Sequence, residues 1–243
     1  MSFERRWKHA LFVATRFFFV PLLGIVLRLR IRGLKNVPKR GGAIVICNHL
    51  GWIDPVLLMA ASPRPILFMA KEEAMNIPVA RWFARQAGTF PVKRSSPDRK
   101  ALRHAQSRLE SGLLVGMFPE GTRSTTGGLK NPFDGASLVA ARTGAPIIPC
   151  AVLGTEALPG SASRDSSQGG YPRVTVVFGE AFTLATETED GGRRSLDELT
   201  EAMMIEIARL VPDRYRGIYA AKAASSHPAV RRDDVRFTGL AGK

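Results

Sequence analysis

The chain has 243 residues, a length that suits one domain with appendages. Hydrophobic residues make up 45% of it, which is enough for a sizeable core and excludes the intrinsically disordered class. The net charge of +14 favours a negatively charged partner such as nucleic acid, anionic lipid or a phosphorylated substrate. The two cysteines lie in apolar runs without a spaced pattern, so a disulfide framework and a cysteine-rich zinc site are excluded, and a reducing compartment is expected.

The first 40 residues combine positive charge with an apolar segment. They hold ten Lys or Arg and one acidic residue, and residues 10–27 between them are almost wholly apolar. A membrane-spanning helix needs about 20 apolar residues, whereas this run is shorter and is interrupted by Arg16 and Pro21. We therefore favour a helical segment over residues 1–35 that enters one leaflet of an anionic membrane, rather than a true span or a buried core helix. A cleaved signal peptide is disfavoured because no small-residue cleavage site follows the run.

The middle of the chain alternates between strand and helix patterns. Strands are predicted at residues 43–47, 66–70, 89–92, 113–118, 147–153 and 174–178. Helices are predicted from Asp54 (as the N-cap) and Pro55 onward and at residues 78–87, 96–111, 135–143 and 196–211, with loops at 157–172 and 184–194. The alternation indicates an α/β fold: a single layered domain over residues 36–211, with a largely parallel or mixed sheet flanked by helices. A basic tail over residues 212–243 is expected to be loosely ordered beyond residue 221.

A histidine and an aspartate follow the first predicted strand. His49 lies at its carboxyl end, where parallel sheets carry their sites, and Asp54 comes five residues later. The turn between them can bring the carboxylate to one imidazole nitrogen and leave the other facing a cleft. That is the base half of a catalytic triad, and it suits a reaction whose nucleophile is a substrate hydroxyl. The same spacing also suits a helix-capping aspartate beside a loop histidine, so the spacing alone leaves catalysis open.

The segment Phe-Pro-Glu-Gly-Thr-Arg-Ser follows another predicted strand and has the parts of an anion cradle. Gly121 lets backbone amides approach a ligand, Thr122 and Ser124 offer hydroxyl donors, and Arg123 offers a bidentate fork. Glu120 is expected to accept a hydrogen bond from a substrate hydroxyl or to position a nearby arginine. A tight turn with a surface salt bridge is the alternative interpretation.

A basic stretch adds two candidate ligands for an anion. Residues 81–108 hold eight Lys or Arg and one acid, and Arg94 closes the segment Gly-Thr-Phe-Pro-Val-Lys-Arg within them. Lys71 directly follows the predicted strand at 66–70 and is a second candidate ligand for the anion. For the cations of the helix predicted at 96–111, an ordinary solvated face is the simpler interpretation.

Four blocks of the chain, in this order, resemble the PlsC-like glycerophospholipid acyltransferases, whose best-known members are the 1-acylglycerol-3-phosphate O-acyltransferases. The blocks are Asn-His-Leu-Gly-Trp-Ile-Asp at 48–54, Gly-Thr-Phe-Pro-Val-Lys-Arg at 88–94, Phe-Pro-Glu-Gly-Thr-Arg-Ser at 118–124 and Ala-Pro-Ile-Ile-Pro-Cys-Ala at 145–151. Residues 69–73 resemble a lesser block of the family. The resemblance runs from about residue 30 to residue 180, and the basic, apolar amino terminus fits the family's membrane-associated helical motif.

The resemblance implies a 1-acylglycerol-3-phosphate O-acyltransferase, which makes phosphatidic acid from lysophosphatidic acid. It implies that His49 is the general base for the acceptor hydroxyl and that Asp54 orients it. The hydroxyl would then attack the thioester of acyl-CoA or acyl carrier protein directly, with no metal and no redox cofactor. The acceptor-binding set implied in the same way is Arg94, Glu120, Thr122 and Arg123, with Gly121 shaping the turn, Ser124 in the same block and Lys71 adding charge.

One departure from the family pattern leaves the acceptor open. Many members follow the third block with Phe-Lys-x-Gly, whereas this chain has Phe-Asp-Gly at 133–135, and Lys130 is a candidate substitute. Another lysophospholipid, a glycolipid or an ornithine lipid is therefore an alternative acceptor. A non-catalytic basic membrane-binding module is the alternative from a different class. Nucleic acid is disfavoured, because the aromatic residues cluster in the apolar amino terminus instead of alternating with cations. We expect the protein at the cytoplasmic face of the cell membrane, on an anionic lipid surface.

Overall fold

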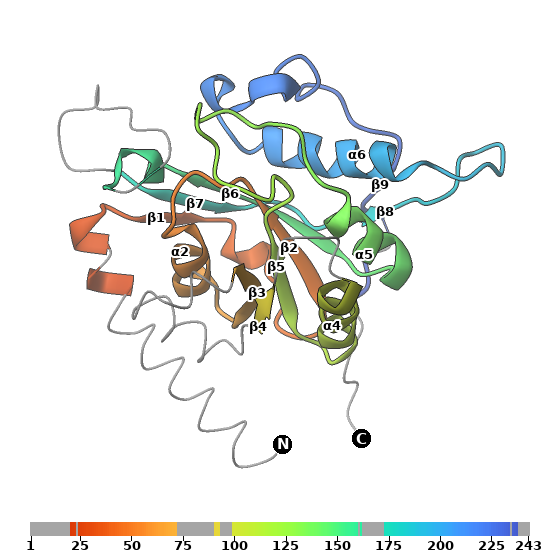
Figure 1. The fold of residues 1–243 in the computed structure, drawn as a ribbon, viewed down its shortest axis with the longest axis horizontal. Coiled ribbons are helices and arrows are strands. Elements are labelled where there is room, and N and C mark those ends of the chain that lie inside the picture. The colour runs from red at the N-terminus through yellow and green to blue at the C-terminus, as the bar shows by residue number, and fades with distance from the viewer. Residues whose placement is uncertain are drawn as a thin grey trace, which may run out of the picture.

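A seven-stranded sheet lies at the centre of the computed structural model, which describes residues 20–22, 24–71, 90–92, 99–159, 161, 173–233 and 235–237. Its strands are β1 (Arg30–Arg32), β2 (Ala43–Cys47), β3 (Ile66–Lys71), β4 (Phe90–Val92), β5 (Leu114–Met117), β6 (Ile147–Leu153) and β7 (Thr175–Phe178), in the order β1-β7-β6-β2-β5-β3-β4 (Figure 1). Strands β2 to β6 run parallel, and β7 pairs antiparallel with β6. The predicted α/β class with a largely parallel or mixed sheet is confirmed.

Two apolar cores lie on opposite faces of the sheet, because side chains alternate along each strand. On β2, Val45 and Cys47 belong to one core, and Ile44 and Ile46 belong to the other. The first core is covered by α2 (Asp54–Ala61), and the second by α4 (Arg99–Glu110), α5 (Gly135–Thr143) and α6 (Leu196–Ala208) (Figure 1). Because helices cover both faces, the central strands are continuous apolar runs rather than alternating ones.

Most predicted elements end within a few residues of the observed ones. The bounds of β2, α5 and β6 are those predicted, whereas α6 ends at Ala208 because turns lead from there into Pro212. Asp54 is the first residue of α2 rather than its N-cap; Ile53 is the N-cap, and it makes no side-chain capping bond. The helix predicted at 78–87 and the start of the helix predicted at 96–111 lie outside the described residues.

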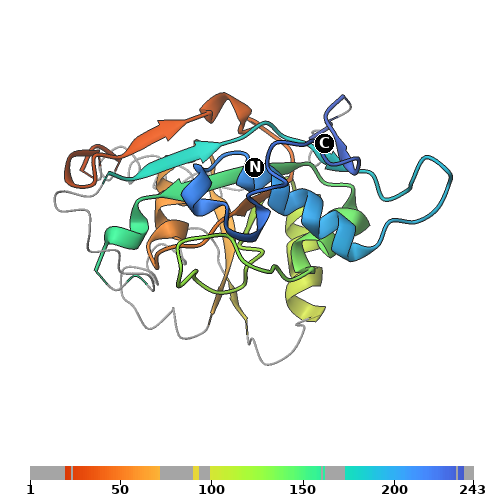
Figure 2. The same ribbon diagram turned by 90° about the horizontal axis from the view of Figure 1, so that it is seen from above.

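Three short strands were not predicted. β1 pairs parallel with β7 at one edge of the sheet (Figure 2), whereas the sequence pattern predicts a helical segment over these residues. Beyond the sheet, β8 (Thr183–Leu184) pairs antiparallel with β9 (Val230–Arg231). Arg232 donates a hydrogen bond to Glu206 of α6, so this part of the tail packs against the domain, where the sequence favoured loose order. Short 3-10 helices cover Leu34–Asn36, Thr155–Ala157, Asp213–Tyr215 and Gly217–Tyr219.

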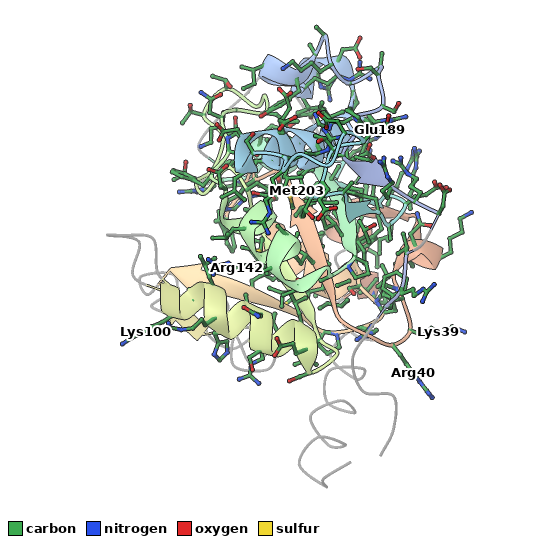
Figure 3. All side chains as sticks on the ribbon, turned by 90° about the vertical axis from the view of Figure 1, so that its right-hand side faces the viewer. Lys39, Arg40, Lys100, Arg142, Glu189 and Met203 are labelled. Carbon is green, nitrogen blue, oxygen red and sulfur yellow. The ribbon has the colours of Figure 1, made fainter. Side chains whose placement is uncertain are left out.

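The surface carries cations in several places and apolar side chains near the amino terminus. Lys39 and Arg40 point outward from the loop before β2, and Lys100 points outward from α4, as a solvated helix face predicts (Figure 3). Just before the buried Leu27, the side chains of Leu22, Ile25 and Val26 are 54%, 79% and 50% exposed. Within the described ranges, no helix combines the length and apolar character that crossing a membrane requires.

Candidate active site

The candidate site lies where three neighbouring parallel strands end. β2 is flanked by β5 and β6, so the carboxyl ends of all three strands meet at one edge of the sheet. Ile46 is paired with Met117, and the same register three residues further on places His49 opposite Glu120. Residue 49 also has the side-chain direction of Val45 and Cys47, which face the core under α2. The strand therefore directs the imidazole toward the helix that begins with Asp54.

Asp54 holds His49 through a carboxylate whose two oxygens are both satisfied. Oδ2 lies 2.9 Å from Nδ1 of His49 and also accepts the backbone N–H groups of Leu50 and Gly51 at 2.7 and 2.8 Å. Oδ1 accepts the hydroxyl of Thr155 at 2.6 Å, and Asp54 is fully buried. These four contacts fix the carboxylate in one position. Its contact with Nδ1 favours the tautomer that carries the proton there, which leaves Nε2 as an acceptor.

Aromatic stacking fixes the plane of the His49 ring. The ring stacks on Phe118 with centroids 4.2 Å apart and planes inclined by 21°. Phe118 stacks in turn on Phe68, at 5.3 Å and 18°. The His49 side chain is 13% exposed, and no described residue makes a hydrogen bond to its Nε2. One acceptor nitrogen of an immobilised imidazole is thus open to a ligand, which is what a general base requires.

Glu120 and Ser124, both predicted to contact the substrate, hold the backbone of His49. Its N–H donates to Oε1 of Glu120 at 3.1 Å, and its carbonyl oxygen accepts the N–H of Ser124 at 2.7 Å. The hydroxyl of Ser124 is buried and donates to the carbonyl oxygen of Gly128 at 2.8 Å. Ser124 therefore closes the loop instead of facing a ligand, and Glu120 positions the histidine.

The carboxyl group of Glu120 is buried beside the loop of His49. It is 1% exposed, and its Oε2 has no hydrogen-bond partner among the described residues. Burial raises the pKa of Glu120 to about 7, although the N–H of His49 and the charge of Lys130 act in the opposite direction. Near neutral pH its carboxyl group is therefore partly protonated.

The turn after β5 depends on a glycine. Gly121 has φ +68°, and a Cβ there would lie 2.6 Å from the ring of Phe133. Next to it, the exposed Thr122 accepts a hydrogen bond from Nζ of Lys130, which also donates to the carbonyl oxygen of Arg123 at 3.3 Å. The turn thus brings the hydroxyl of Thr122 and the ammonium group of Lys130 together at the edge where His49 lies.

The structure brings most of the predicted residues together. His49, Asp54, Glu120, Gly121, Thr122, Arg123 and Ser124 lie at the same edge of the sheet. Lys71 is the last residue of β3, so its backbone ends at this edge too. The side chain of Lys71 and the whole of Arg94 lie outside the described residues.

Sequence reasoning missed two residues that support the histidine. Thr155 bonds to Asp54, and Asn48 exchanges two hydrogen bonds with the backbone of Val152, at 2.9 and 2.8 Å. Thr155 closely follows the end of β6, so its place after a third predicted strand was a usable signal. Asn48 lies inside the first sequence block, but its hydrogen bonds to β6 could not be predicted, because they depend on β2 and β6 being neighbours in the sheet.

Residues 28–153 match the protein-family model described as Acyltransferase. The chain belongs to this acyltransferase family. It is 31% identical over 177 residues to the chloroplastic 1-acyl-sn-glycerol-3-phosphate acyltransferase LPAT1 of Arabidopsis thaliana, with 70% of this chain and 49% of that protein covered. It is 29% identical over 194 residues to the 1-acyl-sn-glycerol-3-phosphate acyltransferase of Bacillus subtilis, with 77% of this chain and 92% of that protein covered. This acyltransferase thus spans about half the length of the Arabidopsis relative and nearly all of the Bacillus one.

A solved structure supports the fold. The acyltransferase resembles the crystal structure of the 1-acyl-sn-glycerophosphate acyltransferase PlsC from Thermotoga maritima with a TM-score of 0.63. The two chains are 24% identical, and the match covers 83% of this chain and 79% of the other. The layered architecture described above is therefore that of a known acyltransferase.

Proposed function

We propose that this acyltransferase moves a fatty acyl group from acyl-CoA or acyl carrier protein to the free hydroxyl of lysophosphatidic acid, which gives phosphatidic acid. The observation that carries the proposal is the pair formed by His49 and Asp54, which leaves Nε2 of the ring open at the strand ends. The named relatives support the choice of acceptor, since both are called 1-acyl-sn-glycerol-3-phosphate acyltransferases.

The reaction needs one base and no covalent enzyme intermediate. Nε2 of His49 takes the proton of the acceptor hydroxyl while the oxygen attacks the thioester carbonyl carbon. The carbon–sulfur bond then breaks, and the leaving thiolate receives the proton back from the imidazolium. Asp54, 2.9 Å from Nδ1, stabilises the imidazolium while it exists.

The acceptor's phosphate is assigned to the cations around the turn after β5. Arg123 lies in that turn, Thr122 offers its hydroxyl, and Gly121 gives the backbone its shape. Arg94 and Lys71 are proposed as further ligands on the sequence resemblance. The bond from the His49 N–H supports a positioning role for Glu120 rather than a direct contact with the acceptor.

The acyl acceptor and the product are lipids, and we propose that the protein works at the cytoplasmic face of the membrane. The part of the amino-terminal segment before the buried Leu27 would enter one leaflet, with cations meeting lipid phosphates, whereas β1 belongs to the sheet. Support comes from Leu22, Ile25 and Val26, which are apolar and exposed at the described end of this segment. A lipid can then reach His49 without its acyl chain passing through water.

Thiol release by the full chain in detergent micelles tests the proposed function. With palmitoyl-CoA, we expect release with lysophosphatidic acid to exceed release with lysophosphatidylcholine, a lyso-ornithine lipid or a glycolipid. His49→Ala removes the base, so kcat should fall by about 10²- to 10⁴-fold. His104→Ala is the matched control, because His104 lies on α4 and accepts a bond from Arg108 at 2.9 Å.

Two results would contradict the proposal. Near wild-type turnover by His49→Ala would show that another group takes the proton. Thiol release with one of the other acceptors, and none with lysophosphatidic acid, would reassign the substrate while keeping the enzyme class.

A further inference from the structure

The carboxyl-terminal segment, residues 213–219, follows α6 and pairs with the loop between β5 and α5. The N–H of Leu129 in that loop donates to the carbonyl oxygen of Tyr215 at 2.9 Å, and the carbonyl oxygen of Leu129 accepts the N–H of Ile218 at 3.3 Å. Gly217 allows this close approach, because a Cβ there would lie 2.0 Å from the Leu129 oxygen. Two backbone hydrogen bonds therefore join the segment to the loop.

The residue before Leu129 carries this connection on to the backbone of His49. The carbonyl oxygen of Gly128 accepts the hydroxyl of Ser124 at 2.8 Å, and the N–H of Ser124 donates to the carbonyl oxygen of His49 at 2.7 Å. Gly128 also packs closely on the segment, since a Cβ there would lie 3.0 Å from Cα of Gly217. The backbone of His49 is thus tied to the carboxyl-terminal segment through one loop.

The side chain of Tyr215 reaches the other member of the candidate catalytic pair. Its hydroxyl donates to Oε1 of Glu156, in the 3-10 helix that follows β6. The preceding residue, Thr155, donates to Oδ1 of Asp54 at 2.6 Å, whereas the other three contacts of this carboxylate are made by Oδ2. The buried Tyr215 also belongs to the same small apolar cluster as Leu50, whose N–H bonds to Asp54. The two loops that hold the pair therefore meet at one tyrosine.

The hydroxyl of Tyr215 is itself held in place. Burial and the bond to Glu156 raise the pKa of Tyr215, so the hydroxyl keeps its proton near neutral pH and remains a donor. Arg214 donates to the same oxygen at 3.1 Å, and its guanidinium carbon lies 4.7 Å from the centre of the ring. The hydroxyl thus acts both as donor and as acceptor, which restricts it to one orientation.

We infer that Tyr215 is a positioning residue for the acyl transfer. By joining the loop between β5 and α5 to the 3-10 helix after β6, it keeps Thr155 on Asp54 and so fixes the carboxylate that orients His49. The inference rests on the proposed function and deepens it. Tyr215 acts through Thr155 and needs no contact with a substrate. Because misplacing a reacting group by about 1 Å can cost about 100-fold in rate, its loss should lower kcat rather than affinity.

Kinetics of the full chain in detergent micelles test this role. Tyr215→Phe removes the hydroxyl and keeps the buried ring, so kcat with palmitoyl-CoA and lysophosphatidic acid should fall by roughly 10- to 100-fold. KM for both substrates should stay within about twofold of the wild-type value. Glu156→Gln keeps an oxygen that accepts the Tyr215 hydroxyl and should keep most of the wild-type kcat. Tyr219→Phe is the matched control, because Tyr219 is a buried tyrosine of the same segment that belongs to the core covered by α4, α5 and α6.

A double-mutant cycle shows whether Tyr215 acts through Thr155. Thr155→Val removes the donor to Oδ1 of Asp54 and should lower kcat over the same range, whereas Thr155→Ser keeps the donor and should retain most of the activity. Since both single changes release the same carboxylate, Thr155→Val combined with Tyr215→Phe should lose no more than the larger single loss.

Proton NMR gives a second measurement that does not depend on turnover. The signal of the Nδ1–H of His49 is assigned by its absence from His49→Ala. In Tyr215→Phe this proton should exchange with water faster than in the wild type, because the carboxylate of Asp54 that holds it is less firmly fixed.

The outcomes separate this inference from the function on which it rests. A wild-type kcat in Tyr215→Phe overturns the positioning role, and so does a rise in KM without a fall in kcat. Losses that multiply in the double variant overturn it as well, because Tyr215 would then act independently of Thr155. If the wild-type chain releases no thiol with lysophosphatidic acid, the proposed function fails, and an unchanged exchange rate of the His49 proton still overturns the role of Tyr215.

Discussion

Glu120 is a carboxyl group buried between the loop of His49 and the turn after β5. One oxygen accepts the N–H of His49 at 3.1 Å, and the other has no partner among the described residues. Burial raises the pKa of Glu120 from its ordinary value of 4.5 to about 7. At intermediate pH the folded state therefore binds a proton that the unfolded chain has already released.

This difference makes the free energy of unfolding depend on pH. Glu120 favours the folded state fully below pH 4.5, and this contribution is lost as the pH rises through about 7. The gap between the two pKa values corresponds to a loss on the order of 3 kcal/mol across that window. Glu120→Gln removes the titration and keeps an oxygen for the N–H of His49. We expect its stability, measured by urea unfolding at several pH values from 4.5 to 7.5, to vary less with pH than that of the wild type.

Glu180→Gln is the control for this measurement, because Glu180 is exposed. The free energy of unfolding of Glu180→Gln should depend on pH as that of the wild type does. A Glu120→Gln variant with an unchanged pH dependence would show that Glu120 is ionised across the whole range.

The spacing of single residues predicted some contacts of the site and not others. His49 and Asp54 are separated by one turn between a strand and a helix, so their contact follows from local structure. The bond from His49 to Glu120 depends on the register between β2 and β5, which no local pattern encodes. The pairing of Cys47 with Cys150 across β2 and β6 also depends on the strand register; both cysteines are buried and make no disulfide.

At the scale of elements, a row of aromatic rings connects β3 with β2. Phe68, Phe118 and His49 stack in succession on the face of the sheet that α2 covers. Gly116 on β5 lies directly beneath Phe68, and a Cβ there would be only 2.3 Å from the ring. Because Gly116 has no side chain, the ring of Phe68 packs directly against the backbone of β5. Phe118 stacks on Phe68, and the ring of His49 in turn stacks on Phe118, which fixes the plane of the imidazole.

Gly116→Ala tests whether this row sets the geometry of the base. The new methyl group would displace Phe68, so Phe118 and His49 would lose part of their stacking. We expect kcat to fall by roughly 10- to 100-fold with KM nearly unchanged, because small misplacements of a reacting group are costly. Overpacking should also lower the free energy of unfolding by about 1–3 kcal/mol.

Gly135→Ala provides the comparison, since a Cβ at the start of α5 would meet only Leu102, at an ordinary 3.7 Å. It should leave kcat unchanged. If Gly116→Ala loses stability but keeps the wild-type kcat, the stacking row is structural only.

Elements were predictable where their own sequence carries a strong signal. β2 and β6 are apolar runs bounded by glycine, asparagine or proline residues, and their predicted bounds agree with the structure. β1, with the sequence Arg-Ile-Arg, and the two-residue strands β8 and β9 are too short for any periodicity. These strands form because a partner strand lies beside each of them, and which strands become neighbours is decided by the whole fold rather than by the local sequence.

At the scale of the whole molecule, positive charge and exposed apolar side chains lie next to each other near the amino terminus. The cations of the amino-terminal segment and the exposed Leu22, Ile25 and Val26 are adjacent in the sequence. The chain enters the core at Leu27 and the sheet at β1, so these exposed side chains lie only a few residues from the folded domain. A membrane surface that covers them would hold the domain close to its lipid substrate.

Replacing Leu22, Ile25 and Val26 together by glutamine tests this arrangement. Burying an apolar side chain contributes about 1.5–3 kcal/mol, so even partial insertion of all three should be measurable. We expect binding to vesicles of phosphatidylcholine and phosphatidylglycerol, measured by flotation, to fall by at least roughly tenfold. The thermal unfolding midpoint should not change, because all three side chains are at least half exposed in the folded chain. Turnover of a short-chain lysophosphatidic acid below its micellar concentration should also persist, since the strand ends that carry His49 are untouched. Undiminished flotation of the triple variant would place membrane contact elsewhere on the molecule.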